Sequence, residues 1–197
     1  MKDWQGNTTS IFATHGASNH SAHDRVEHDF YATPPHAVEL LLDIEPLAQR
    51  IVEPCCGQGH ISRVLETHGH TVISRDLYDY GYGEPDHDFL MAGPDDVPDD
   101  CDIVTNPPYK YAREFAEQSL RLLAPGRKCV MFLKLTFLEG KGRKPLFDTG
   151  QLRTVYVSRS RLNCGMNGEF VGTSAVAYAW FVWEKGWRGE PVIRWFN

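Results

Sequence analysis

A strand, a glycine-bearing turn, a helix and a second strand follow one another within residues 50–76, and this run constrains the fold more than any other. The apolar run RIVEP leads into the turn CCGQG, and residues 60–69 then have helical spacing that ends at Gly69. The next run, HTVISRDL, again has the composition of a strand. Two strands joined through a helix pack in parallel, so the sequence predicts an α/β protein built on a mainly parallel sheet.

The rest of the chain continues this alternation and ends with an antiparallel pair. Helical patterns occupy 35–49 and 110–126, and apolar runs predict strands at 101–106 and 128–138 with a brief strand near 88–91. Two late strands, at 152–158 and 174–185, are expected to pair as a hairpin. We therefore predict a seven-stranded, mainly parallel sheet with one antiparallel strand and helices on both faces.

Length and composition indicate one globular domain. The chain has 197 residues, of which 42% are hydrophobic, and no domain linker is visible. Residues 1–28 are polar, rich in His and without period, so we expect a flexible arm before a single domain at 29–197. No apolar stretch approaches the ~20 residues of a membrane span, and no signal peptide is apparent.

The cysteines and histidines indicate a reduced, cytoplasmic protein without a metal. Five cysteines form an odd number and lack metal-ligand spacing. The vicinal pair Cys55 and Cys56 is expected to be small packing residues in a turn, because redox pairs are spaced Cys-x-x-Cys. The arm histidines have one HxxH spacing but no acidic or cysteine partners, so no metal site is expected from His15, His20, His23 or His28.

Charge is distributed unevenly along the chain. The net charge is −6, yet residues 110–161 hold twelve Lys or Arg against four Asp or Glu. Because salt screens charges beyond about 10 Å, an acidic protein can still present a basic face to phosphates. The alternative is ordinary solvated surface. If the face is basic, the residues expected to contact nucleic acid are Lys134, Lys141, Arg143, Lys144, Arg159 and Arg161, and Arg153 belongs to the same stretch.

Residues 106–109, Asn-Pro-Pro-Tyr, form a corner that follows a predicted strand. Each proline fixes φ, lacks an N–H and biases the preceding residue away from the helix, so the corner must be stiff and extended. It holds a carboxamide, a carbonyl and an aromatic ring in fixed relative positions. A loop that merely ends the strand is the alternative for an isolated pair of prolines.

The turn after the first strand carries Gly57 and Gly59 directly behind Glu53. Glycines at this end of a parallel strand let the backbone approach a ligand. A dinucleotide fingerprint would place a third glycine where the chain has Ser62, and Glu53 would repel a pyrophosphate. Asp76, after the second strand, can accept both hydroxyls of a ribose. The pocket therefore suits a nucleoside with a positively charged tail, a description that S-adenosylmethionine fits.

In this order, the turn, Asp76 and the Asn-Pro-Pro-Tyr corner resemble the amino-methyltransferases of the Rossmann-like class. The resemblance is strongest to the DNA adenine N6-methyltransferases of phages and prophages. The segments DFYATPP at 29–35, DFL at 88–90 and AVAYAWFVWEKG at 175–186 are similar to further motifs of that family. The resemblance covers residues 15–197. It implies a class I methyltransferase fold and an enzyme that transfers a methyl group from S-adenosylmethionine to the N6 amine of adenine in DNA.

The resemblance also implies roles for the matching residues. The Asn106 oxygen and the Pro107 carbonyl would each accept an amino hydrogen, while the ring of Tyr109 would stack on the flipped base. No covalent intermediate is required. The expected catalytic residues are Asn106, Pro107, Pro108 and Tyr109. The expected cofactor-binding residues are Tyr31, Thr33, Pro34, Glu53, Pro54, Cys55, Gly57, Gly59, Asp76, Leu77, Asp88, Phe89 and Asn106. For Tyr31 the alternative is simple packing, and for Asp88 a solvated acid.

Other functions share these features. Only 88 residues follow Tyr109, so no separate target-recognition domain is expected, and the enzyme would use its loops, a homodimer or an accessory recognition subunit to select duplex DNA. An Asn-Pro-Pro-Tyr corner also resembles the N-methyltransferases that act on rRNA bases or on a glutamine of release factors. A catalytically silent module that binds cofactor or nucleic acid is the alternative from a different class.

Overall fold

The computed structural model describes residues 31–162, 165–166 and 176–197. The strands are β1 (Tyr31–Ala32), β2 (Arg50–Glu53), β3 (Thr71–Ser74), β4 (Cys101–Thr105), β5 (Lys128–Lys134), β6 (Leu152–Ser158), β7 (Gly165–Met166), β8 (Tyr178–Glu184) and β9 (Val192–Phe196). The α-helices are α2 (Pro35–Ile44), α3 (His60–Thr67), α4 (Ala112–Leu122) and α5 (Lys144–Asp148). The short 3-10 helices are η1 (Phe89–Met91), η2 (Pro94–Asp96), η3 (Tyr109–Tyr111), η4 (Leu135–Leu138) and η5 (Lys141–Arg143).

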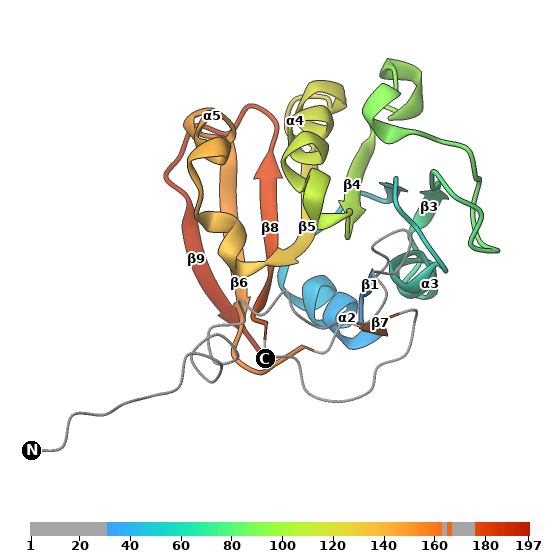
Figure 1. Ribbon diagram of the computed structural model, residues 1–197, viewed down its shortest axis with the longest axis horizontal. Coiled ribbons are helices and arrows are strands. Elements are labelled where there is room, and N and C mark those ends of the chain that lie inside the picture. Colours follow the sequence, from blue (N-terminus) through green and yellow to red (C-terminus); the bar gives the residue numbers. More distant parts are fainter. Residues whose placement is uncertain (1–30, 163–164, 167–175) are drawn as a thin grey trace, which may run out of the picture.

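Seven strands form the main sheet in the order β3-β2-β4-β5-β8-β6-β9 (Figure 1). All neighbouring pairs are parallel except the two that involve β8. A mainly parallel seven-stranded sheet with one antiparallel strand is therefore confirmed, as is the antiparallel pairing of the two late strands. A separate two-stranded sheet joins β1 to β7.

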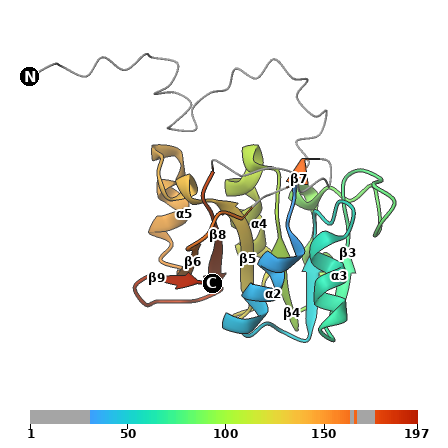
Figure 2. The same cartoon turned by 90° about the horizontal axis from the view of Figure 1, so that it is seen from below.

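Helices cover both faces of the sheet and divide the core into two clusters (Figure 2). One cluster packs α4 and α5 against the sheet through Phe115, Ala116 and Leu146, and the other packs α2 and α3 through Leu41 and Leu65. Alternation along a strand explains the division, because successive side chains point to opposite faces. The central strands β4, β5 and β8 are buried on both sides, as their continuous apolar sequences predict.

The structure differs from the sequence-based expectation at several elements. The strand expected at 128–138 ends at Lys134, and Leu135–Leu138 form the 3-10 helix η4. Residues 88–91 were expected to form a strand, but Asp88 accepts a hydrogen bond from the Leu90 N–H at 3.0 Å and caps the 3-10 helix η1. Helix α2 ends at Ile44 rather than near residue 49, because Pro46 favours an extended Glu45. The seventh strand is instead β9, which was not expected, and it extends the sheet beyond β6.

Candidate active site

The parallel strands β2, β3 and β4 are neighbours, so their carboxyl ends meet at one edge of the sheet (Figure 1). This edge carries the glycine turn after β2, Asp76 after β3 and the Asn-Pro-Pro-Tyr corner after β4. Open α/β sheets bind ligands at such an edge. The order of the strands therefore brings together three features that are spread along the chain. The first and the last of them, Glu53 and Asn106, are 53 residues apart.

Both glycines of the turn adopt left-handed backbone conformations, but for different purposes. Gly57 has φ +51°, and its N–H donates to the Asp76 Oδ2 at 2.8 Å. Gly59 has φ +80°, and a Cβ at this position would lie 2.5 Å from the ring of Tyr82. We expected Gly59 to make room for a ligand, whereas the structure fills that space with an aromatic side chain from the segment after β3. The Tyr82 hydroxyl also donates to the carboxylate of Glu66 on α3 at 3.2 Å.

Asp76 is buried, and both of its carboxylate oxygens accept backbone N–H groups. Its Oδ1 accepts from Tyr78 at 3.1 Å, and its Oδ2 accepts from Gly57. Burial raises the pKa of Asp76, and the hydrogen bonds from Tyr78, Gly57 and Leu77 oppose this rise. A carboxylate has about four lone-pair positions, so at least one remains for a further donor after these three bonds. Leu77, which follows directly, is 44% exposed at the same edge.

Glu53 is directed toward helix α3. It is 1% exposed, and its Oε2 accepts from both the N–H and the hydroxyl of Ser62, at 2.8 Å for the N–H. The Ser62 hydroxyl also lies 2.6 Å from that of Ser74 on β3. Burial raises the pKa of Glu53 well above its ordinary value, and the bonds from Ser62 oppose this. At least one oxygen of Glu53 therefore holds the turn against α3, a structural role that sequence reasoning missed.

The cysteines of the turn are not activated as nucleophiles. Cys55 is half-buried and Cys56 is buried, and neither forms a disulfide. Burial raises the pKa of Cys55 well above its usual value, and the nearby Asp76 adds to the rise. Burial likewise raises the pKa of Cys56 to about 12. Both thiols stay protonated at neutral pH, in agreement with their expected role as packing residues.

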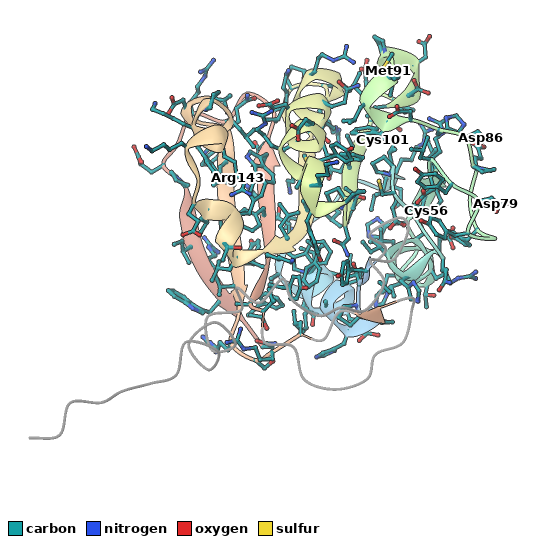
Figure 3. The ribbon with its side chains drawn as sticks, in the orientation of Figure 1. Cys56, Asp79, Asp86, Met91, Cys101 and Arg143 are labelled. Atoms are coloured by element: carbon teal, nitrogen blue, oxygen red, sulfur yellow. The ribbon has the colours of Figure 1, made fainter. Side chains whose placement is uncertain are left out.

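A cavity of about 310 Å³ opens beside the turn. Pro54, Asp88 and the largely buried ring of Phe89 form part of its wall, as does Arg75, which binds Asp96 at 3.2 Å. The cavity is bounded on its outer side by the segment between β3 and β4, from which the labelled side chains of Asp86 and Met91 come (Figure 3). Three residues expected to contact the cofactor thus line one cavity: Pro54, Asp88 and Phe89.

The side chain of Asn106 is fixed at one end and open at the other. Its Nδ2 donates to the Tyr31 carbonyl oxygen at 2.7 Å, an arrangement that only the amide nitrogen can satisfy. The Oδ1 is buried and, among the residues that the structure describes, has no hydrogen-bond partner. Pro107 is buried, and Pro108 is half-buried with an extended backbone as expected, but the extended part ends there because Tyr109 begins the 3-10 helix η3. Buried acceptors are normally paired, so this carboxamide oxygen is open to a donor that lies outside the described residues.

The short strand β1 supplies the Tyr31 carbonyl and leads into the other expected residues of its segment. Thr33 is 2% exposed, and its hydroxyl is also without a partner within the described ranges. Pro34 is half-buried and precedes the first turn of α2. The ring of Tyr31 lies 5.7 Å from that of Tyr109 at an interplanar angle of 32°. The structure therefore brings this segment to the Asn106 corner, although the two are 75 residues apart.

Tyr109 belongs to a group of aromatic rings and lies under a cation. Its ring is half-buried and lies 6.2 Å from that of Tyr178, which stacks on Phe132 at 5.2 Å. The Lys134 ammonium lies 4.7 Å from the Tyr109 ring centroid. Lys134 is the last residue of β5, the strand next to β4, and this proximity in the sheet brings the cation to the ring. Tyr178 and this cation–π contact were not expected from the sequence.

The basic residues divide between the two edges of the sheet. Lys134 ends β5, and the exposed Arg159 and Arg161 follow the carboxyl end of β6. From there the chain passes to β7, which pairs with β1 beside Asn106. Lys141 is exposed on η5, which the bond from Arg113 to the Gly142 carbonyl ties to the start of α4. These four cations therefore lie at the edge that carries Asn106, where the Arg159 Nη1 donates to the Asn197 main-chain oxygen at 3.5 Å.

The remaining basic residues of the stretch have other positions or partners. Arg153 binds the buried Glu45 at the amino end of β6, the opposite edge, so the expectation of one shared edge is wrong for Arg153. Lys144 starts α5, which leads toward the amino end of β6 (Figure 1), and pairs with Asp148. Arg143 (Figure 3) donates to the Glu139 carbonyl and lies 4.6 Å from the Phe137 ring. The charge pattern along the sequence did not reveal this division, because the chain crosses from the carboxyl end of β5 back to the amino end of β6.

Two exposed residues next to the corner were also missed. Tyr111 is 42% exposed, and the Lys110 ammonium lies 5.0 Å from its ring centroid. Interleaved cations and aromatic rings are typical of nucleic-acid surfaces, and the run YKY after the second proline was a signal for them.

Two kinds of feature are absent from the described part of the chain. No group of three or more His, Cys, Asp or Glu side chains there has the arrangement of a metal site, and the histidines of residues 1–28 lie outside it. No helix among the described residues is long and apolar enough to cross a membrane. The expected arm, and most of the Gly/Asn-rich segment 163–173, also lie outside the described residues.

Comparisons with known proteins support the fold. No family model matches the sequence, and no curated protein matches it. Among solved structures, TrmN from Thermus thermophilus is 21% identical with a TM-score of 0.52 over 77% of this chain. A modification subunit of a putative type I restriction enzyme from Vibrio vulnificus is 14% identical with a TM-score of 0.57 over 93%. The chain spans 48% of the length of each of these two proteins.

A putative class I S-adenosylmethionine-dependent methyltransferase from Listeria monocytogenes gives a TM-score of 0.59 at 12% identity, covering 94% of this chain and 71% of that one. At such identities the likeness concerns the fold. The mainly parallel sheet, its single antiparallel strand and its two helical layers are those of the Rossmann-like class I methyltransferase fold.

Proposed function

We propose that the protein is an S-adenosylmethionine-dependent methyltransferase that acts on the exocyclic N6 amine of adenine in DNA. The observation that carries the proposal is the Asn106 carboxamide, whose nitrogen is bonded to Tyr31 and whose buried oxygen lacks a partner among the described residues. The Asn-Pro-Pro-Tyr sequence and the class I fold support the same conclusion.

The residues present fit the cofactor. Asp76 keeps at least one acceptor position for a ribose hydroxyl, and the cavity beside it carries Asp88 and Phe89 for an adenine ring. Of the other expected contacts, Tyr31, Thr33, Pro34, Pro54, Cys55, Gly57 and Leu77 lie on the segments that surround this edge. When bound, S-adenosylmethionine supplies an electrophilic methyl group on a sulfonium. Glu53 and Gly59 would contribute by holding the turn, since Glu53 bonds Ser62 and Gly59 packs against the Tyr82 ring.

Asn106 would activate the target amine through hydrogen bonding. The amino group of adenine is a poor nucleophile because its lone pair is delocalised into the ring. An amino hydrogen donated to the Asn106 Oδ1, and a second donated to the Pro107 carbonyl, would shift electron density back to nitrogen. The prolines hold both acceptors in place before the substrate arrives, so most of the rate enhancement would come from orientation.

The DNA substrate is supported by charge and by fold likeness. The exposed cations Arg159, Arg161 and Lys141 lie where they can contact phosphates at the edge that carries Asn106. Tyr109 offers an aromatic ring to a base that has left the duplex stack. One of the proteins with this fold is a modification subunit of a restriction enzyme. In this proposal, an accessory recognition subunit or a second copy of the chain would select the DNA sequence that is methylated.

A tritium-transfer assay tests the proposal. The protein is incubated with labelled S-adenosylmethionine and, in parallel, duplex DNA, single-stranded DNA, rRNA and a release-factor protein, followed by nucleoside analysis. We expect label in N6-methyldeoxyadenosine. Label in RNA or protein alone would keep the chemistry and overturn the substrate, and no transfer despite cofactor binding would overturn the enzymatic function of the isolated chain.

A further inference from the structure

The contact between Lys134 and Tyr109 lies where the target base would have to bind. The Lys134 ammonium is 4.7 Å from the ring centroid, within the range of a cation–π interaction. The Tyr109 ring is half-buried, with both core clusters packed against it. A charged ammonium avoids burial, so it lies on the solvent side of the ring. That side is the one that a base entering from solvent would use.

An ammonium and a base cannot occupy the same side of one ring. Tyr31 and Tyr178 lie at tilted angles of 32° and 38° to Tyr109, at centroid distances of 5.7 Å and 6.2 Å. They restrict the lateral position of an incoming base. Stacking on Tyr109 therefore requires the Lys134 ammonium to leave the ring. Its backbone cannot follow, because Lys134 is the last residue of β5 and is paired with Tyr178.

We propose that Lys134 is a displaceable positioning residue, which covers the Tyr109 ring in the free enzyme and moves to a phosphate beside the target base when the base enters. This inference rests on the proposed function. The four-carbon stem lets the ammonium change partners while the backbone stays fixed. The free energy of the phosphate contact would offset the loss of the cation–π contact, so a base attached to its phosphate is favoured over a free nucleoside.

The proposal predicts opposite effects of one substitution on two ligands. In Lys134→Met the ring is no longer covered by a cation and the phosphate contact is lost. With duplex DNA, KM should rise roughly 5-fold, and the slope of log KM against log salt should fall by about one, while kcat stays within about 2-fold. Deoxyadenosine, which has no phosphate, should inhibit Lys134→Met at concentrations about 2–5-fold lower than wild type.

Two further variants make the experiment specific. Lys134→Arg keeps a cation and should behave as wild type with both ligands. Arg188→Met removes an exposed cation beyond the carboxyl end of the antiparallel strand β8, at the opposite edge of the sheet, and it should leave both measurements unchanged. A purely structural role for Lys134 would weaken both ligands in parallel, and this result would overturn the proposal. Equal behaviour of wild type and Lys134→Met, or no inhibition of either by deoxyadenosine, would also overturn it.

The failure of this inference can be distinguished from that of the proposed function. If wild type binds S-adenosylmethionine and transfers no methyl group to DNA, the proposed function fails and the inference fails with it. If wild type methylates DNA and Lys134→Met changes neither KM nor inhibition by deoxyadenosine, the inference alone fails.

Discussion

Glu45 and Asn106 lie at opposite edges of the main sheet, and the two buried groups differ in how completely they are bonded. The Glu45 carboxylate is 1% exposed and accepts from Lys128, Arg153 and the Tyr156 hydroxyl, the last at 2.8 Å. The Asn106 oxygen is buried with no partner among the described residues. At the amino edge, burial of a polar group is compensated within the chain. At the carboxyl edge one buried acceptor has no partner among the described residues, and the proposed function assigns it to the substrate amine.

The largest effect is expected at the amino edge. Glu45→Ala leaves the partly buried Lys128 and Arg153 without their shared carboxylate, and the free energy of unfolding should fall by about 3–5 kcal/mol. Urea denaturation measures this change. Asp148→Ala, which removes the exposed partner of Lys144, is the control and should cost less than about 1 kcal/mol. An equally small cost for Glu45→Ala would mean that the network at this edge contributes little to stability.

The next effect is on activity at the carboxyl edge. Asn106→Ala should lower kcat by about 100–1000-fold, because an acceptor for the target amine is removed from a preorganised site. The lost bond to the Tyr31 carbonyl should cost only about 1 kcal/mol of stability. Methyl-transfer kinetics and calorimetric titration with S-adenosylmethionine measure both properties. Parallel loss of cofactor affinity and turnover would instead indicate that the corner supports the fold of the site.

Substituting one glycine at each edge by alanine compares how the two edges tolerate an added Cβ. Gly59 and Gly126 both have φ +80°, but a Cβ at Gly59 would meet the Tyr82 ring, whereas a Cβ at Gly126 would meet nothing within 4 Å. Gly126→Ala should therefore show only the cost of a left-handed alanine, about 1–2 kcal/mol. Gly59→Ala should cost more and weaken cofactor binding, as measured by thermal unfolding and calorimetry. Equal costs at both positions would show that the Tyr82 ring moves away from an added Cβ at little cost in free energy.

The smallest effect is a dependence of stability on pH. The pKa of Glu53 is raised in the folded protein, so between the unfolded and folded pKa values the folded state binds more protons. Stability from this group is full below the unfolded pKa and is lost as pH rises through the folded pKa. Relative to Glu53→Gln, wild type should lose at most about 1.4 kcal/mol per pH unit above about pH 4.5. Denaturation at several pH values tests this, and parallel curves would contradict it.

Local sequence patterns predicted six of the seven strands of the main sheet and the corner after β4, because these features depend on neighbouring residues, but β1, β7 and β9 were not predicted. The pattern failed at 88–91, where the capping carboxylate of Asp88 produced a helical turn instead of a strand. The saturated network of Glu45 was not predicted, since its partners are 83 to 111 residues away. The bond from Asn106 to Tyr31 was not predicted for the same reason, since the two residues are 75 positions apart. Pairings across the sheet fixed which polar groups became structural and which stayed open.

The two-residue pairing of β1 with β7 has a consequence for how the site assembles. It joins Tyr31 to Met166 and Ala32 to Gly165, contacts of very long sequence separation maintained by a very short ladder. Loop closure of this length is slow, and short ladders open with little free energy. Strand β1, whose Tyr31 carbonyl accepts from Asn106, should therefore be among the last elements to form, and the amide protons of this ladder should be among the first to exchange. Mild heating would then switch off turnover by local opening, well below the temperature at which the main sheet unfolds.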